Sequence, residues 1–246
     1  MYSDIFCKVY NAFGWNYYPE IFGQELLKWL DANAVRPETA LDLACGTGIL
    51  CRILHDAGIA AEGTDLSPGM IAIARENNPD IPFRVADMVT DRPDRKVALV
   101  TCTGDAVNHI PDLGDVAQIF RNVWECLLPG GLFVFDILDE GEVSDSEPFE
   151  MDFTETTRVW FQMTRPTAQG VNLKIRVYEN GTLAFEENIR ETIHDREVLC
   201  RLLEAAGFEL LRCARSLMPG DNPGTTWFLI ARKPTEQLES NCLPAL

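Results

Sequence analysis

The sequence predicts an α/β fold built on a doubly wound, mostly parallel sheet, and three observations support this prediction. Short apolar runs alternate with helical patterns from residue 39 to residue 138, which is the order of successive strand–helix–strand units. The run at 97–102, VALVTC, is nearly all apolar, as expected for a strand that is covered on both faces. The run at 39–43 leads into Gly46-Thr47-Gly48, and such glycines allow backbone to approach a ligand closely.

The first half of the chain divides into elements at recognisable start and stop residues. Leu26, Leu27 and Leu30 form one apolar stripe of an amphipathic helix. Gly58 ends a later helix, and Ser67 is placed to cap a helix that begins at the next residue. The expected elements are a helix over 21–32, a strand over 39–44, a helix over 48–57, a strand over 59–65, a helix over 68–78, strands over 82–86 and 97–102, a helix over 115–128 that Pro129-Gly130-Gly131 stops, and a strand over 132–138.

The pattern changes after residue 138. Residues 139–155 carry eight acids and no Lys or Arg, which indicates a solvated loop or a segment that attracts a cationic amine. Three β-type runs follow, and Asn180-Gly181 between two of them is a strong hairpin signal. The predicted remainder is an inserted antiparallel meander with strands at 156–164, 171–179 and 183–192, a helix over 195–206 that Gly207 ends, closing strands over 208–214 and 226–232, and a polar tail over 233–246.

Length, charge and cysteine usage limit the possible classes of protein. The 246 residues suit one domain over 1–246 with an N-terminal aromatic cap at 1–34 and the meander at 139–194. A net charge of −17 argues against nucleic acid and against an anionic membrane surface as partners. The N-terminus lacks the pattern of a signal peptide, and no run is long enough to span a membrane. The eight scattered cysteines favour reduced thiols in the cytoplasm, and His55, His109 and His194 lack the spacing of metal ligands, so no metal site is expected.

Three acids follow the first three predicted strands at the positions expected around a nucleoside-bearing cofactor. Asp42 lies beside the glycine turn, Asp65 ends the second strand and Asp87 ends the third. An acid after the second strand is placed to accept hydrogen bonds from ribose hydroxyls. The dinucleotide-binding fingerprint is incomplete, because Cys51 occupies the position of its third glycine.

In these features the chain resembles the class I S-adenosylmethionine (SAM)-dependent methyltransferases. The matching segments are LDLACGTG at 41–48, GTDLS at 63–67, VADM at 85–88, TCTGDAVNHI at 101–110 and LLPGGLFVFDI at 127–137, in the order and spacing of the family. Together they cover roughly residues 35–138. The resemblance implies a Rossmann-like sheet of seven strands whose last strand is antiparallel, and SAM as the cofactor.

The resemblance also implies roles for the residues of the glycine turn. The main chain near Ala44, Cys45 and Gly46 is expected to meet the methionine part of SAM. Gly46 and Gly48 are expected to let the turn pass beneath the cofactor. Asp42 is expected to help hold the amino group of the methionine part.

Side chains after the second and third strands are expected to hold the nucleoside. Asp65 would accept two hydrogen bonds from the ribose hydroxyls, which a carboxylate can do with both oxygens. Leu66 and Met70 would flank the adenine, although Met70 also suits core packing. Asp87 would meet the adenine amino group unless it caps a turn instead, and the Met88 N–H would meet a ring nitrogen.

The loop after the fourth strand and the aromatic N-terminus are expected to border the transferred methyl group. Thr103 begins this loop, and Asp105 or His109 could accept a proton from the attacking amine or hydroxyl; His109 could instead form a wall of the pocket. Tyr10 and Trp15 could cover the cationic sulfonium with aromatic faces, or they could pack on the core.

The predicted function is SAM-dependent transfer of a methyl group to an N or O atom of a small molecule. An NAD(P)-dependent oxidoreductase and a SAM-binding protein without catalysis are the alternatives. The oxidoreductase shares the scaffold and the ribose acid, but Cys51 and the absence of a Tyr-x-x-x-Lys pair count against it. The non-catalytic alternative stays open because no residue here is indispensable to methyl transfer. The chain is expected to act as a monomer or homodimer, with the meander serving as part of the substrate pocket or as a dimer contact.

Overall fold

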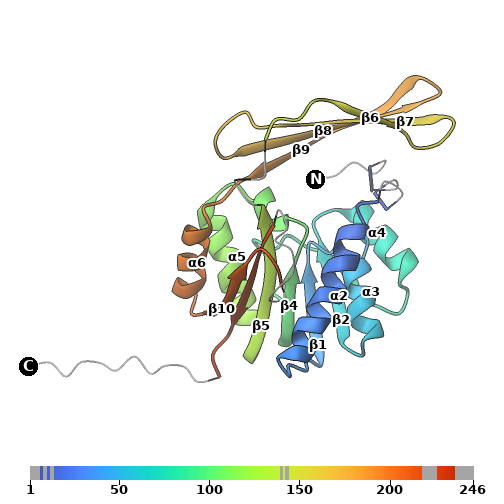
Figure 1. Cartoon of the computed structure of the whole chain (residues 1–246). Helices are drawn as coiled ribbons and strands as arrows, with labels where there is room; N and C mark the ends of the chain where they lie inside the picture. Colours follow the sequence, from blue (N-terminus) through green and yellow to red (C-terminus); the bar gives the residue numbers. More distant parts are fainter. Residues whose placement is uncertain are drawn as a thin grey trace, which may run out of the picture.

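The computed structural model describes residues 6–7, 10–11, 14–138, 141, 144–217 and 226–235. They form a large sheet flanked by helices and a smaller sheet that lies above one edge of it (Figure 1). None of the helices in these ranges is long and apolar enough to cross a membrane.

The large sheet contains seven strands in the order β10-β11-β5-β4-β1-β2-β3. Strands β1 to β5 are parallel, and β11 runs antiparallel to both of its neighbours. The predicted fold class is therefore confirmed, including the antiparallel last strand. The strands are β1 (Thr39–Leu43), β2 (Ala60–Asp65), β3 (Phe83–Val85), β4 (Val97–Cys102), β5 (Leu127–Leu138), β10 (Glu209–Ala214) and β11 (Thr226–Arg232).

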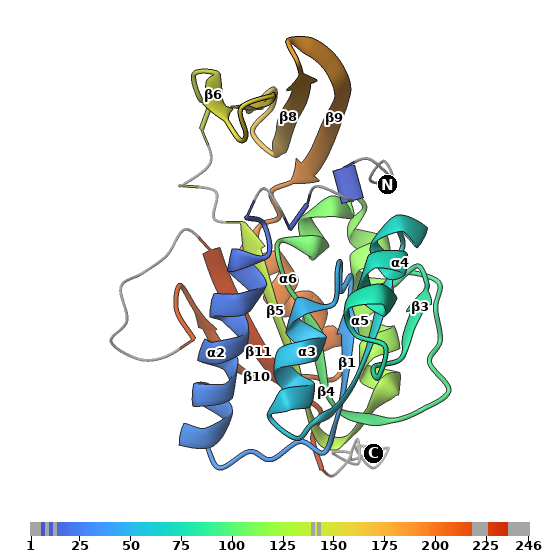
Figure 2. The same ribbon diagram turned by 90° about the vertical axis from the view of Figure 1, so that its right-hand side faces the viewer.

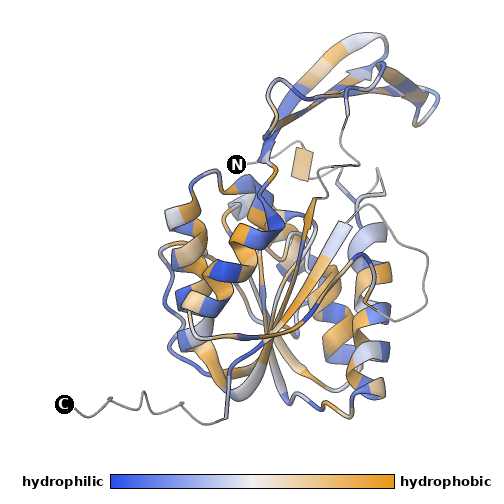
Figure 3. Ribbon diagram, turned by 60° about the vertical axis from the view of Figure 1, so that its left-hand side comes forward, coloured by the Kyte–Doolittle hydropathy of each residue, from blue (hydrophilic) through white to orange (hydrophobic). Residues whose placement is uncertain are grey.

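Helices cover both faces of this sheet because successive strand residues point to opposite sides. Leu41 and Leu43 of β1 face one apolar core, whereas Ala40 faces the other. The first core is closed by α5 (Leu113–Cys126) and α6 (Arg196–Ala205), and the second by α2 (Tyr17–Ala32), α3 (Ile49–Asp56) and α4 (Pro68–Asn77). Figure 2 shows α2 and α3 side by side, and Figure 3 shows the apolar interior between the layers.

Helix boundaries follow local capping. The Ser67 hydroxyl accepts the Met70 N–H at the start of α4, as predicted. The α5 helix begins two residues earlier than predicted because the Asp112 carboxylate accepts N–H groups from Gly114 and Asp115. The predicted helix end at 128 and strand start at 132 were wrong: α5 ends at Cys126 and β5 begins at Leu127, so residues 129–131 lie within β5, where the backbone of 130–131 pairs with Lys233.

The smaller sheet is the predicted meander with one additional strand. Its order is β6-β7-β8-β9, with β6 (Phe149–Asp152), β7 (Thr157–Thr164), β8 (Gly170–Glu179) and β9 (Thr182–Thr192), all antiparallel. The expectation of a plain loop throughout 139–155 was wrong for 149–152, which pair with β7. One face of this sheet packs Val159, Ile175 and Val177 against Phe6 near the N-terminus. The small sheet is thereby held over the carboxyl ends of the parallel strands (Figure 1).

Candidate active site

The candidate site lies at the carboxyl ends of the parallel strands, where β1 pairs with both β2 and β4. From β1 the chain first builds the sheet toward β2 and β3, and it then crosses to β4 on the other side of β1. Open α/β sheets bind ligands at the point where the strand order reverses in this way. The loops after β1, β2, β3 and β4 all reach this edge. The small sheet and the described N-terminal residues lie above it (Figure 1).

The glycine turn after β1 has the backbone that a close approach requires. Ala44, Gly46 and Gly48 all have positive φ, at 53°, 53° and 81°. A Cβ on Gly46 would meet no heavy atom within 4 Å, so the space beside it is open, whereas a Cβ on Gly48 would lie 2.7 Å from the Phe83 ring. Gly63 of β2 is equally tight, 2.7 Å from the Cys45 sulfur. Gly48 and Gly63 are therefore required by close packing. Gly46 instead leaves open space beside the turn, and this space is called the cradle below.

Replacing Gly46 by alanine is expected to weaken SAM binding about tenfold while costing about 1 kcal/mol of stability. The positive φ accounts for the lost stability, and the new Cβ in the open cradle accounts for the lost affinity. Gly58→Ala is the matched control, since Gly58 also has positive φ and open space but ends α3. Thermal melts should show similar losses for both variants, and calorimetric titration with SAM should separate them. If Gly46→Ala and Gly58→Ala bind SAM equally well, SAM does not occupy the open space beside Gly46.

Asp65 holds the turn and keeps capacity for a ligand. One carboxylate oxygen accepts the Gly46 N–H at 2.9 Å, and the other accepts the Ser67 N–H at 2.8 Å. Burial raises the pKa of Asp65, and these two hydrogen bonds oppose the rise. Each oxygen has a second lone pair, so the ribose contact that the sequence predicts fits this carboxylate. The open cradle and the carboxylate beside it fit the nucleoside-bearing SAM.

Asp42 lies deeper than its predicted role requires. Its side chain is buried, and its two oxygens accept from the Thr101 hydroxyl at 2.6 Å and the Cys51 thiol at 3.8 Å. Burial raises its pKa to about 7. The carboxylate thus ties β1 to β4 and α3 beneath the turn, and Cys51 acts as a donor at the position of the missing third glycine. A direct contact with SAM stays a prediction.

The residues expected around the adenine take different positions. Leu66 is 49% exposed at the carboxyl end of β2. Met70 is 1% exposed in the cluster with Phe6, which is the core-packing alternative. Asp87 accepts the Val89 N–H at 2.8 Å with one oxygen, so it caps the turn as the second of its two predicted roles requires. Its other oxygen is left for a ligand. Met88 packs on the α5 side, 3.9 Å from the Cys102 sulfur.

The N-terminal residues that the structure describes cross the site. The Tyr10 ring packs with Phe6 and Trp15, with ring centroids 5.8 and 5.5 Å away. Burial raises the pKa of Tyr10, and the charges of Asp105 and Asp65 raise it further. The Tyr10 hydroxyl therefore feels the charges of both acids, which are expected at the ribose end and the methyl end of the site.

Two side chains near the N-terminus bond directly to the large sheet, one to the glycine turn and one to β5. The Thr47 hydroxyl donates to the Asn11 side-chain oxygen at 2.8 Å, next to the glycine turn. The Tyr18 hydroxyl donates to Asp136 near the end of β5. Asp136 is fully buried and also accepts the Gly104 and Asp105 N–H groups, at 3.1 and 3.0 Å. It thereby holds the loop in which Asp105 takes a left-handed φ of 52°.

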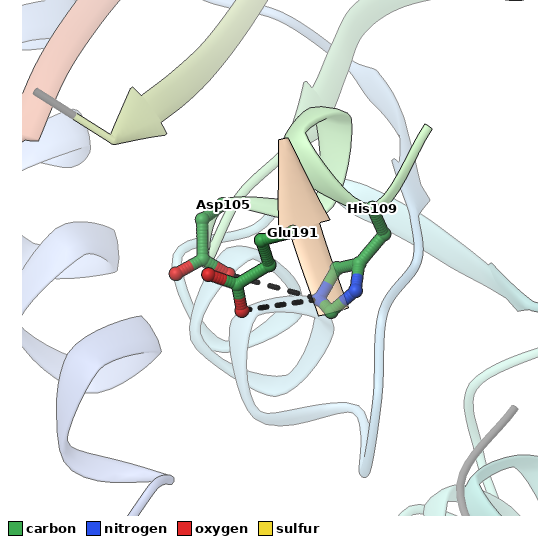
Figure 4. Close-up of side chains that lie close together, drawn as sticks. All are labelled: Asp105, His109 and Glu191. Atoms are coloured by element: carbon green, nitrogen blue, oxygen red, sulfur yellow. Dashed lines mark ion pairs between the residues drawn. The ribbon is translucent and has the colours of Figure 1, made fainter. Parts of the chain in front are cut away.

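Asp105 and His109, the predicted catalytic pair, meet a third side chain that the sequence did not reveal (Figure 4). The His109 Nε2 lies 3.9 Å from an Asp105 oxygen and 3.8 Å from a Glu191 oxygen. Asp105 precedes the short 3-10 helix η1 (Ala106–His109), and Glu191 comes from the end of β9 in the small sheet. The insertion thus contributes an acid to the site.

The three side chains form a largely buried cluster of two acids and one imidazole, and both acids hold their protons more tightly than usual. Within the described ranges, His109 is the only ion-pair partner of either carboxylate. Burial raises the pKa of Glu191 to about 7, and burial together with Glu191 and Asp136 raises the pKa of Asp105 well above its usual range. Burial also lowers the pKa of His109, which favours the neutral imidazole. The ligand atoms lie within 4.8 Å of one another, a spacing that a bound cation would suit.

Sequence reasoning missed Glu191 and Asp136 for different reasons. Asp136 was detectable, because it is one acid inside the apolar run FVFDI. Glu191 lies in an alternating strand with other acids, and no local signal distinguishes it. The expectation of no metal site considered spacing among His and Cys residues and could not include an acid more than eighty positions away.

The comparisons with known proteins agree with this geometry. A family model described as a methyltransferase domain matches residues 40–131. The chain is 27% identical over 238 residues to a dTDP-3-amino-3,6-dideoxy-alpha-D-glucopyranose N,N-dimethyltransferase of Streptomyces fradiae, covering 92% of this chain and 89% of the relative. It is 31% identical over 126 residues to a putative methyltransferase of Bacillus subtilis, covering 49% and 51% of the two chains.

Solved structures share the fold. SAM-bound CalS10, an amino pentose methyltransferase from Micromonospora echinaspora, has a TM-score of 0.74 at 21% identity, over 95% of this chain and 98% of that one. The CcbJ methyltransferase from Streptomyces caelestis has a TM-score of 0.78 at 19% identity, over 93% and 96%. These matches do not favour the oxidoreductase or the non-catalytic alternative. Residues 40–131 thus match a methyltransferase domain, the chain has the fold of solved SAM-dependent methyltransferases, and these matches support a methyltransferase that uses SAM as its cofactor.

Proposed function

We propose that this enzyme methylates the amino group of an amino sugar carried by a nucleotide. The observation that carries the proposal is the group formed by Asp105, His109 and Glu191 at the carboxyl end of β4, beneath the small sheet. The name of the Streptomyces fradiae relative, which spans nearly the whole chain, supports an amino sugar as the substrate class.

A cationic amine suits this group better than a neutral hydroxyl. Burial raises the pKa of both acids, and the charge of Glu191 raises that of Asp105 further. An ammonium ion between them would favour their charged forms, because an opposite charge lowers the pKa of a neighbouring acid. A hydroxyl acceptor carries no charge that would offset the cost of two buried acids.

The acceptor nitrogen must lose a proton before its lone pair can attack. SAM, when bound, supplies an already activated methyl group. Asp105 and Glu191 would hold the ammonium, and the neutral Nε2 of His109 would accept one proton from it. The two carboxylates then stabilise the imidazolium that forms, as neighbouring negative charges do. The amine is left neutral, with its lone pair available.

Positioning would supply the remainder of the rate. Methyl transfer requires a nucleophile that is close to the methyl carbon and aligned with the bond that breaks. The small sheet would form the roof of the acceptor pocket, and Tyr10 would help exclude water between the ribose end and the methyl end. This is the role of substrate-pocket wall that the sequence suggests for the insertion.

The proposal is tested by offering purified enzyme and SAM a matched pair of acceptors. A nucleotide-linked amino sugar should be methylated at least about 100-fold faster than the same sugar with a hydroxyl in place of the amine. Mass spectrometry would count the methyl groups added, and tandem spectra would locate them on nitrogen. Faster methylation of the hydroxyl analogue would contradict the proposal.

A chelator provides a second control because the same three side chains could ligate a divalent metal. Activity is expected to be unchanged by chelation and inhibited by added Zn²⁺, which would compete with the ammonium. Loss of activity on chelation would assign the group to a metal instead.

A cytoplasmic location and a monomeric or homodimeric state stay predictions. The cysteines that the structure describes are all free thiols, in keeping with a cytoplasmic location.

A further inference from the structure

Asn108 joins three elements that meet at the acceptor site. It lies in η1, and its side chain is fully buried. The amide nitrogen donates to the Thr192 carbonyl at 2.8 Å, at the end of β9. The amide oxygen accepts the Leu138 N–H at 3.1 Å, at the end of β5. These partners lie 84 and 30 positions away in the sequence, so the contacts are tertiary.

The bond to Thr192 determines where β9 ends relative to the large sheet. Glu191 is the residue immediately before Thr192, and β9 is an edge strand of the small sheet that pairs only with β8 in that sheet. A second tether follows at His194, whose Nε2 lies 2.9 Å from the Ile110 carbonyl. Both tethers attach β9 to the segment that carries His109, and the Asn108 bond lies next to Glu191.

We propose that Asn108 is a positioning residue that holds Glu191 against Asp105 and His109, so that the small sheet becomes a working part of the methyl-transfer site. This inference rests on the proposed function, because it requires Glu191 to act on the acceptor amine. Asn108 itself need not touch the amine: it acts through the end of β9.

An amide is the side chain that this position requires. It supplies a donor for the Thr192 carbonyl and an acceptor for the Leu138 N–H, and both partners are backbone groups. Alanine removes both bonds and leaves the two backbone groups unpaired. Serine is smaller but keeps a hydroxyl that can bond one of them. A carboxylate would keep the acceptor and turn a negative charge toward the Thr192 carbonyl.

Loss of the tether should also change how the site titrates. The groups that face Glu191 are the Asp105 carboxyl and the His109 imidazole. Asp105 in turn lies near the Asp136 carboxyl, and its charge acts on the Tyr10 and Tyr18 hydroxyls. If Glu191 moves toward solvent, its burial and its repulsion of Asp105 both decrease. The acid limb of the pH profile of kcat/KM should then move to lower pH.

The test is a double-mutant cycle that combines Asn108→Ala with Glu191→Gln. Asn108→Ala alone is expected to lower kcat/KM for the amine about 30-fold, and Glu191→Gln alone about 100-fold. In the Glu191→Gln background, Asn108→Ala should cost less than about threefold, because the group that it positions is already neutral. Thr39→Val is the control. It removes the hydroxyl that accepts the Ala98 N–H at the amino-terminal ends of β1 and β4, and it should change kcat/KM little.

The possible outcomes separate this inference from the proposed function. If the losses of kcat/KM from Asn108→Ala and Glu191→Gln multiply in the double variant, Asn108 is merely structural and the inference is overturned. The same holds if Asn108→Ala leaves the acid limb of the pH profile of kcat/KM where it is. No effect of Glu191→Gln would overturn the proposed function itself. SAM titration and thermal melts verify that each variant is folded. If Asn108→Ala does not fold, Asn108→Ser in both backgrounds gives the same comparison, and additivity there overturns the inference equally.

Discussion

Glu191→Gln is expected to lower kcat for amine methylation about 100-fold while leaving SAM affinity nearly unchanged. Glutamine keeps the size of the side chain but removes the charge that would hold the ammonium and stabilise the protonated imidazole of His109, 3.8 Å away. Steady-state kinetics with a nucleotide-linked amino sugar and calorimetric titration with SAM measure the two quantities. A loss of SAM affinity equal to the loss of rate would place Glu191 at the cofactor instead.

The same substitution is expected to stabilise the protein above neutral pH. Burial raises the pKa of Glu191 from 4.5 to about 7, so the folded state holds this proton more tightly than the unfolded chain does. The stability that results is fully present below about pH 4.5 and is lost as the pH rises through about 7. At about pH 8 the variant should therefore be more stable by at most about 3 kcal/mol, and this advantage should disappear near pH 4.

Glu186→Gln is the matched control for both measurements. Glu186 lies on the same strand, β9, but forms ion pairs with Arg176 and Lys174 on the other face of the small sheet. Its substitution should leave the rate of methylation unchanged and should give no stabilisation at high pH. A gain in stability in this control would show that net charge, and not burial at Glu191, is the cause.

Asp65→Ala is expected to weaken SAM binding about 100-fold, which is about 3 kcal/mol. The variant would lose two hydrogen bonds from the ribose hydroxyls, and it also loses the carboxylate that accepts the Gly46 and Ser67 N–H groups at 2.9 and 2.8 Å. Calorimetric titration measures the affinity. Unchanged affinity would exclude Asp65 as a cofactor ligand.

Two controls separate the ribose contact from damage to the turn. Asp65→Asn keeps an oxygen that can accept one of the two backbone N–H groups, so it should keep most of the stability and still bind SAM poorly. Asp56→Ala removes an exposed acid that pairs with Arg52 at the end of α3, and it should not change SAM affinity. If Asp65→Asn restores full affinity, the role of Asp65 is to support the turn.

Much of the large sheet could be predicted because its signals are local. The apolar run of β4, the glycine turn after β1 and the cap at Ser67 each depend on residues within a few positions of one another, and the structure confirms them. The errors occurred where pairing with another strand decides the outcome. Residues 149–152 are exposed and include two acids, yet they form β6 because β7 offers them backbone partners.

The site divides in the same way. Its expected cofactor half lies where β1, β2 and β3 end, so Gly46, Asp65 and Asp87 could be singled out from the sequence, with their roles implied by the family resemblance. Its acceptor half is assembled from η1, β9 and the N-terminus, and the spacing of Asp105 and His109 gives no sign that Glu191 joins them.

The sequence by itself determined the parallel α/β scaffold, the family resemblance and the glycine turn after β1, because strand periodicity, glycine backbone freedom and helix caps act over short stretches of chain. Only the tertiary structure decided that Asp42 is buried beneath the turn, that Met70 packs in the core and that the insertion delivers Glu191 to His109. Burial and carboxylate repulsion depend on what surrounds a side chain in space, and that environment exists only once distant segments have packed together.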